Sequence, residues 1–166
     1  MASYLNYVTS NYSLSLLSIP AYHVLALLPH FYSFHLGTQG DSSKWRNANS
    51  RGQTHAKEIQ TRLSPAQYNR FERARAAHAN AMENLPLFVA AVLASKFVAI
   101  AKGESVGESL GTDALAVRLL LARAVYTAMY LFVKDDRVAG LRTLVWLYGV
   151  QQCWKSIIGA AWALAH

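Results

Sequence analysis

Four apolar segments, each long enough to cross a lipid bilayer, constrain the fold of this chain more than any other feature of its sequence. A transmembrane helix needs about 20 predominantly apolar residues, and long apolar runs without strict alternation favour helices over strands. Ser64 and Pro65, an N-cap residue followed by proline, mark the start of the second segment. We therefore predict an all-α integral membrane protein, a single domain over residues 1–166 with transmembrane helices at approximately 13–36, 65–101, 112–133 and 138–165.

Several ionisable residues lie within or beside these segments, namely Glu83, Arg118, Arg123, Arg142 and Lys155. A charged side chain at membrane depth is costly unless it faces the interior of a bundle or reaches an interface. Only 15% of the residues are charged, whereas soluble domains have about 25%. The charges that remain in the spans therefore favour a packed four-helix bundle over four independent anchors.

The connections between the segments differ in charge, which predicts the orientation of the chain in the membrane. Residues 37–64 contain five basic residues (Lys44, Arg46, Arg51, Lys57 and Arg62) and two acidic ones (Asp41 and Glu58). Residues 102–113 contain one lysine and three acidic residues. Because basic loops stay in the cytosol, we expect residues 37–64 and the short loop 134–137 to be cytosolic.

Two classes of partner are not expected. The net charge of +7 does not come from a basic patch interleaved with aromatic residues, so we predict no nucleic-acid binding. The chain has a single cysteine, Cys153, and His23 and His30 share a helix face without a third ligand at metal-binding spacing. We therefore predict no metal site.

Polar residues form stripes along the apolar segments. Positions i, i+3, i+7 and i+10 share one face of a helix, and the residues on these stripes and beside them are Arg73, Asn80 and Glu83 on the second segment, Arg123, Tyr126 and Tyr130 on the third, and Arg137 and Arg142 at the fourth. Glu83 and Arg123 are expected to pair, because a lone buried charge is far less stable than a buried pair. The set predicts either a polar ligand pocket near the cytosolic boundary or hydrogen bonding between helices alone.

The same residues resemble a known family. The stretch "ERARAAHANAMENLPLF" (72–88), with its N-x-x-E-x-x-P element, is similar to the second helix of the MAPEG family, the membrane-associated proteins in eicosanoid and glutathione metabolism. "RAVYTAMY" (123–130), "RVAGLR" (137–142) and "NANSRG" (47–52) resemble further elements of that family in the same order. The resemblance covers most of the chain, including its four-span layout.

The resemblance implies a MAPEG-like homotrimer in an endoplasmic-reticulum-type membrane. It implies a glutathione transferase or a glutathione-assisted isomerase that takes a lipophilic substrate laterally from the membrane lipids. Glutathione would bind between subunits near the cytosolic face and contact Arg73, Asn80, Glu83, Arg123, Tyr126 and Tyr130. Arg137, with Arg142 as the second candidate, would stabilise its thiolate, because a nearby guanidinium lowers the pKa of a thiol, and Glu83 and Tyr130 complete the expected catalytic set.

The chain departs from the family pattern at two alanines. Ala76 lies in the middle of the stripe where eicosanoid-forming members carry arginine, and Ala79 stands where some members have a second arginine. Arginine binds carboxylates bidentately, and glutathione has two carboxylates. A glutathione-independent cyclase or isomerase that uses Glu83 and the tyrosines as acid and base, and a non-catalytic lipid-binding protein, therefore stay open as alternatives.

Overall fold

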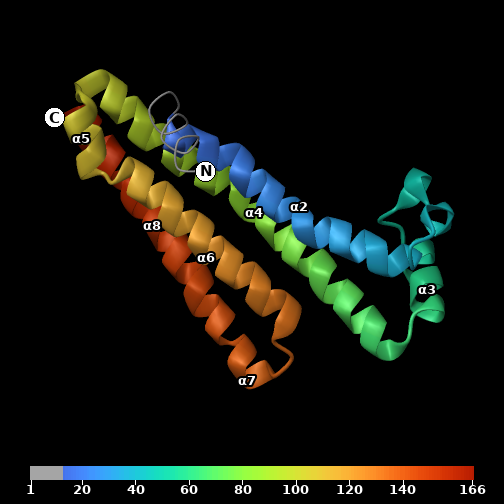
Figure 1. Ribbon diagram of the computed structural model, residues 1–166. Coiled ribbons are helices and arrows are strands. Elements are labelled where there is room, and N and C mark those ends of the chain that lie inside the picture. The colour runs from blue at the N-terminus through green and yellow to red at the C-terminus, as the bar shows by residue number, and fades with distance from the viewer. Residues whose placement is uncertain (1–12) are drawn as a thin grey trace, which may run out of the picture.

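The long helices form two pairs, α2 (Leu14–Thr38) with α4 (Pro65–Lys102) and α6 (Thr112–Phe132) with α8 (Leu141–Ala165), which lie close together near α5 (Glu104–Ser109) and diverge towards their other ends (Figure 1). The computed structural model describes residues 13–166, except for the side chains of Glu108, Asp136 and Arg137. The short elements between the long helices are η1 (Ser42–Lys44), η2 (Asn47–Asn49), α3 (Gln53–Arg62), α5 and α7 (Asp136–Ala139).

Helix α4 is the centre of the arrangement, since it contacts α2, α6 and α8. It packs closely on α2 because Ala77 and Ala81 of α4 and Ala26 of α2 are buried and small, and small residues let two membrane helices approach. The hydroxyl of Tyr22 crosses this contact and donates a hydrogen bond to the Ala81 carbonyl, 3.2 Å away. Tyr22 also packs against Phe88, with 4.7 Å between the ring centroids, so the α2–α4 contact continues into the core of the bundle.

The described residues confirm the predicted all-helical fold, and α2, α4 and α6 lie within two residues of the predicted segments. The predicted fourth segment, 138–165, is instead divided between α7 and α8. Among the described residues, three helical stretches are long and apolar enough to cross a membrane: Leu14–Thr38, Pro65–Lys102 and Glu104–Phe132. Helix α8 has 25 residues, but Gln151, Gln152 and Lys155 make it more polar. The chain is thus built as an integral membrane protein, while the fourth span and the homotrimer stay predictions.

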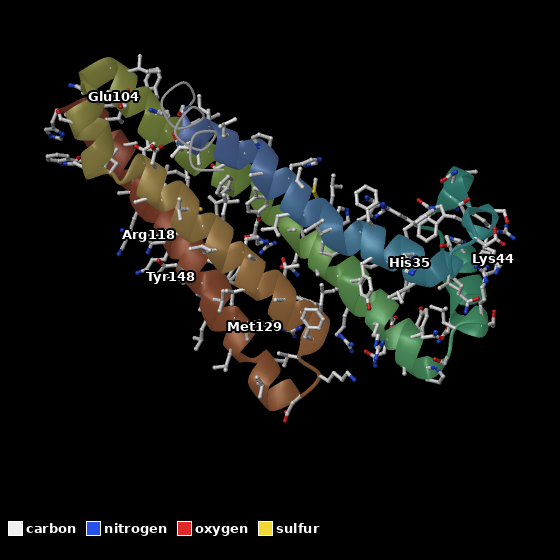
Figure 2. The ribbon with its side chains drawn as sticks, in the orientation of Figure 1. His35, Lys44, Glu104, Arg118, Met129 and Tyr148 are labelled. Atoms are coloured by element: carbon white, nitrogen blue, oxygen red, sulfur yellow. The ribbon has the colours of Figure 1, made fainter. Side chains whose placement is uncertain are left out.

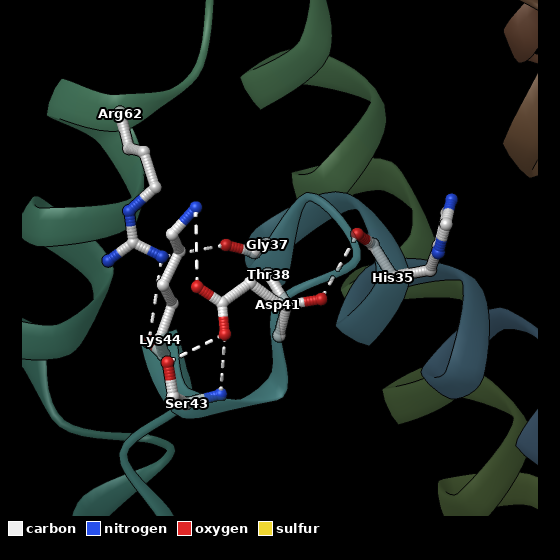
Figure 3. A network of polar contacts seen from close by, with 7 residues as sticks. All are labelled: His35, Gly37, Thr38, Asp41, Ser43, Lys44 and Arg62. Carbon is white, nitrogen blue, oxygen red and sulfur yellow. Dashed lines mark hydrogen bonds and ion pairs between the residues drawn. The ribbon is translucent and has the colours of Figure 1, made fainter.

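The connection between α2 and α4 is more ordered than the predicted loop, because it contains α3 and is fixed at both ends. Arg62 donates from Nη1 to the Gly37 carbonyl at the end of α2, 3.0 Å away. Asp41 accepts hydrogen bonds from the Ser43 backbone and hydroxyl, and these bonds lower the pKa of its carboxyl group. Figure 3 shows this network, which ties α3 back onto the end of α2.

A small apolar cluster supports the same connection. Ile59 of α3 and Leu63, which follows α3, are buried against Phe71 at the start of α4, with Trp45 packed beside them. A Cβ atom on Gly37 would lie 3.1 Å from the Trp45 ring and 3.2 Å from the Phe71 ring. Gly37 therefore lets the end of α2 approach this cluster.

The two ends of the bundle carry different charges, as the sequence predicts. Lys44 lies at the end that holds α3, and Glu104 lies at the opposite end (Figure 2). Glu104 makes an ion pair with Lys96 at 3.8 Å. The basic connection 39–64 and the connection that contains Glu104 therefore lie at opposite ends of the bundle.

His55 gives the ordered connection a dependence on pH. The His55 side chain is 2% exposed and lies edge-on to Trp45, with 4.8 Å between the ring centroids. Burial lowers the pKa of His55, a shift that Glu58 opposes and that Arg62 and Arg46 reinforce. The folded connection therefore binds a proton less readily than the unfolded chain.

Because the folded-state pKa of His55 is depressed, its contribution to stability is present above the unfolded value of about 6.5. That contribution is lost as the pH falls below this value. We expect amide hydrogen exchange in residues 42–62 to accelerate as the pH falls from about 7 to about 5, after correction for the pH dependence of the intrinsic exchange rate. The acceleration should begin near the unfolded pKa of His55. His55→Phe keeps an aromatic ring in the cluster and should remove this dependence; an equal acceleration in the variant would contradict the role of His55.

Candidate functional site

Helices α4 and α6 hold a polar cluster in an otherwise apolar bundle. The Tyr126 hydroxyl donates a hydrogen bond to Asn80 Oδ1, 3.2 Å away. The guanidinium of Arg123 lies over the Tyr126 ring, 4.8 Å from its centroid. Tyr126 in turn contacts Tyr130, with 5.7 Å between the ring centroids. The structure thus brings together four of the predicted site residues, which we call the Asn80–Arg123 cluster: Asn80, Arg123, Tyr126 and Tyr130.

Arg123 has an unusual environment for a cation. Its side chain is only 6% exposed, and it also lies over the Tyr22 ring, 5.7 Å from the centroid. Within the part of the chain that the structure describes, its Nε and Nη2 atoms are buried without a hydrogen-bond partner. Each cation–π contact with an aromatic ring stabilises the guanidinium by about 0.5–2 kcal/mol, whereas burying an unpaired charge costs several kcal/mol. Arg123 is therefore poised to accept an anionic group.

The predicted ion pair between Glu83 and Arg123 is wrong for a single chain. No ion pair joins them among the described residues, and Glu83 is exposed. Three residues turn an α-helix by about 300°, so Glu83 points about 60° away from Asn80. At this angle Glu83 makes no ion pair with Arg123 in the described chain.

Glu83 instead lines a cavity of about 330 Å³ where α4 meets α2 and the connection after it. The cavity also contains His30 and His78, whose ring centroids are 4.9 Å apart, together with Arg51 and Arg75. His78 Nδ1 lies 2.9 Å from the Ala26 carbonyl, which fixes its ring. We call this space the α2–α4 cavity.

The remaining predicted arginines lie nearer to the end of the bundle. Arg73 donates from Nη1 to Asn69 Oδ1 at 2.7 Å, and it lines a separate cleft with Arg142. The Arg142 guanidinium also lies over the Tyr130 ring, 4.2 Å from its centroid. Arg137 belongs to α7, but its side chain is outside the described residues. The structure therefore joins Arg142 to the cluster through Tyr130 and separates Arg73 from it.

Three further residues belong to the site: Tyr22, Asn84 and Trp146. No sequence motif predicted them. Tyr22 covers Arg123 from α2. Trp146 of α8 donates from Nε1 to Asn84 Oδ1, 3.0 Å away. All three line a cavity of about 40 Å³ beside Arg123. Asn84 falls one turn after Asn80, so a repeat of amides along α4 was the one signal that pointed to it.

The cluster can bind and orient an anionic, hydrogen-bonding ligand. Arg123 supplies a fixed positive charge, and the amide of Asn80 and the phenols of Tyr126 and Tyr130 supply donors and acceptors. Among the described residues, no group of three histidine, cysteine, aspartate or glutamate side chains gathers that could hold a metal ion.

Comparison with known proteins gives one match. The model of the MAPEG family matches residues 19–162, which is nearly the whole chain and includes every residue of the Asn80–Arg123 cluster. No curated protein and no solved structure matches the chain. With a family model matched from α2 to the last turns of α8, this chain belongs to the MAPEG family.

Proposed function

We propose that this integral membrane protein is an enzyme that uses glutathione, either as a transferase or as an isomerase that needs it, on a lipophilic substrate. The observation that carries the proposal is the buried guanidinium of Arg123, whose Nε and Nη2 atoms have no partner among the described residues. Glutathione has two carboxylates and a thiol, and an anion beside Arg123 would remove the cost of the unpaired charge.

Each residue of the cluster has a task in this proposal. Arg123 would hold a carboxylate through charge-assisted hydrogen bonds, and Asn80 with Tyr126 would orient the peptide. Tyr130 would face the reacting end, where Arg142 already lies against its ring. Glutathione would supply the nucleophilic thiolate when bound. A guanidinium at this end, from Arg142 or from Arg137, would lower the pKa of its thiol.

We further propose that the site is completed in a homotrimer in the endoplasmic reticulum membrane, with loops 37–64 and 134–137 in the cytosol. Glu83 supports this arrangement, because it is exposed and makes no ion pair with Arg123 within the described chain. An exposed carboxylate there can contact a ligand held by a neighbouring copy. The lipophilic substrate would enter from the membrane lipids between copies.

Binding of glutathione to the detergent-purified full chain tests the proposal. We expect saturable binding, an increase in thiolate absorbance and a conjugate with a generic aryl halide. Asn80→Ala should weaken binding by up to about tenfold, the value of one hydrogen bond. Asn69→Ala is the matched control, since Asn69 lies on the same helix but contacts Arg73. No binding and no conjugate at millimolar glutathione would overturn the proposal.

A second candidate function rests on the α2–α4 cavity. There Glu83 shares one space with His30 and His78, and a carboxylate beside two imidazoles is suited to general acid–base catalysis. This arrangement favours a glutathione-independent cyclase or isomerase. Under this alternative, Glu83→Gln would abolish turnover of a lipophilic substrate in the absence of glutathione, and normal turnover by the variant would exclude it.

A further inference from the structure

A second polar cleft opens at the end of the bundle where α6 turns into α8. Its volume is about 470 Å³, and its walls come from the first turns of α4, the turn after α6, and the start of α8. The described residues that line it are Ala66, Asn69, Arg73, Val133, Lys134, Ala139 and Arg142. None of them belongs to the Asn80–Arg123 cluster, but Arg142 connects the cleft to that cluster through its contact with Tyr130.

The cleft is strongly basic. Arg73, Lys134 and Arg142 bring three positive charges to one space, and no carboxylate is among its described lining residues. Arg73 is held by Asn69, yet its Nε is buried with no hydrogen-bond partner in the described part of the chain. Arg142 is held against the Tyr130 ring and donates from Nε to the Ala139 carbonyl, 3.2 Å away. Two guanidiniums are thus fixed in place beside a lysine.

Two large apolar residues next in the chain to lining residues of the cleft are exposed. Phe132 precedes Val133 and is 77% exposed, and Leu141 precedes Arg142 and is 51% exposed. In a chain built to cross a membrane, such residues face acyl chains. The cleft therefore combines a basic recess with an apolar surface at one level of the bundle.

We propose that this cleft binds the phosphate headgroup of an anionic phospholipid, with the acyl chains lying along Phe132 and Leu141. Arginine matches phosphate through paired hydrogen bonds. Basic recesses between membrane helices on the cytosolic side bind anionic headgroups. The exposed apolar residues beside the cleft favour a lipid over free phosphate, which would gain nothing from them.

Binding of phosphatidic acid to the detergent-purified full chain tests this site, with phosphatidylcholine as the neutral comparison. We expect the chain to prefer phosphatidic acid. Arg73→Gln and Lys134→Gln should each weaken that binding by about fivefold, the value of one cation near a phosphate surface. Lys134 is exposed in the turn after α6, so its replacement leaves the helix packing unchanged.

Lys57→Gln is the matched control, because it removes one exposed positive charge from α3 without touching the cleft. It should bind phosphatidic acid as the unmodified chain does. The proposal is overturned if phosphatidic acid binds no better than phosphatidylcholine, or if neither cleft variant weakens its binding. It is also overturned if inorganic phosphate displaces the lipid at comparable concentration, since the occupant is then a free anion. None of these outcomes bears on glutathione binding, which is measured separately.

Discussion

Replacing Arg123 with methionine is expected to abolish glutathione binding and turnover while leaving the thermal stability of the ligand-free protein unchanged or higher. Arg123 is 6% exposed and lies among Tyr22, Tyr126 and apolar residues of the bundle. Methionine fills a similar volume and fits irregular spaces. The two properties should therefore change in opposite directions.

The expected changes in stability and in glutathione affinity follow from the environment of the guanidinium without and with ligand. Without ligand, its charge is buried and two of its nitrogens lack partners in the described chain. Apolar replacement of buried ionic groups is neutral or stabilising by about 1–4 kcal/mol. With ligand, the same charge would make two charge-assisted hydrogen bonds, and at about 1.5–3 kcal/mol each their loss lowers affinity by at least a hundredfold.

The measurement is the melting temperature in detergent with and without glutathione. The unmodified chain should melt higher when glutathione is added, because a ligand that binds only the folded state stabilises it. Arg123→Met should melt at the same temperature in both conditions. Arg118→Met, which removes an exposed arginine from the same helix, should retain the shift. If Arg123→Met lowers stability and still binds glutathione, Arg123 has a structural role only.

The positions of the helices could be predicted from the sequence because they depend on local features. Pro65 begins α4, and the Ser64 side chain caps it together with Gln67, as the Ser-Pro pair predicts. The apolar segments end where the structure ends α2, α4 and α6, within two residues. The predicted fourth span is divided, because α7 ends at Ala139 and α8 begins after Gly140, and glycine weakens a helix interior.

The contacts between helices could not be predicted in the same way. Periodicity shows which residues share a face of one helix, but the rotation of that helix against its neighbours decides what they touch. Tyr126 contacts Asn80, as the stripes suggest. Glu83 does not pair with Arg123, and Tyr22 of α2 covers the Arg123 guanidinium instead. The order of α3 also escaped prediction, because its buried residues, His55 and Ile59, contact distant Trp45 and Phe71.

Replacing Ala76 with arginine is expected to tighten glutathione binding by about tenfold or more. Ala76 lies one turn before Asn80 on the same side of α4 and is half-buried, so a longer side chain there can extend toward a ligand at Asn80. Arginine would add a bidentate contact to the second carboxylate of glutathione, and one such contact is worth about 1.5–3 kcal/mol.

The experiment separates the two functions proposed for this chain, because only one of them needs glutathione. Ala76→Gln is the matched control, since glutamine adds length and hydrogen bonding without charge and should change affinity far less. Two results together would count against glutathione. Ala76→Arg would bind glutathione as weakly as Ala76→Gln, and the unmodified chain would convert a lipophilic substrate without glutathione. The site beside Ala76 would then not bind the carboxylates of glutathione. The acid–base function at Glu83, His30 and His78, which share one cavity, would then account for the activity, because it needs no arginine to hold a carboxylate.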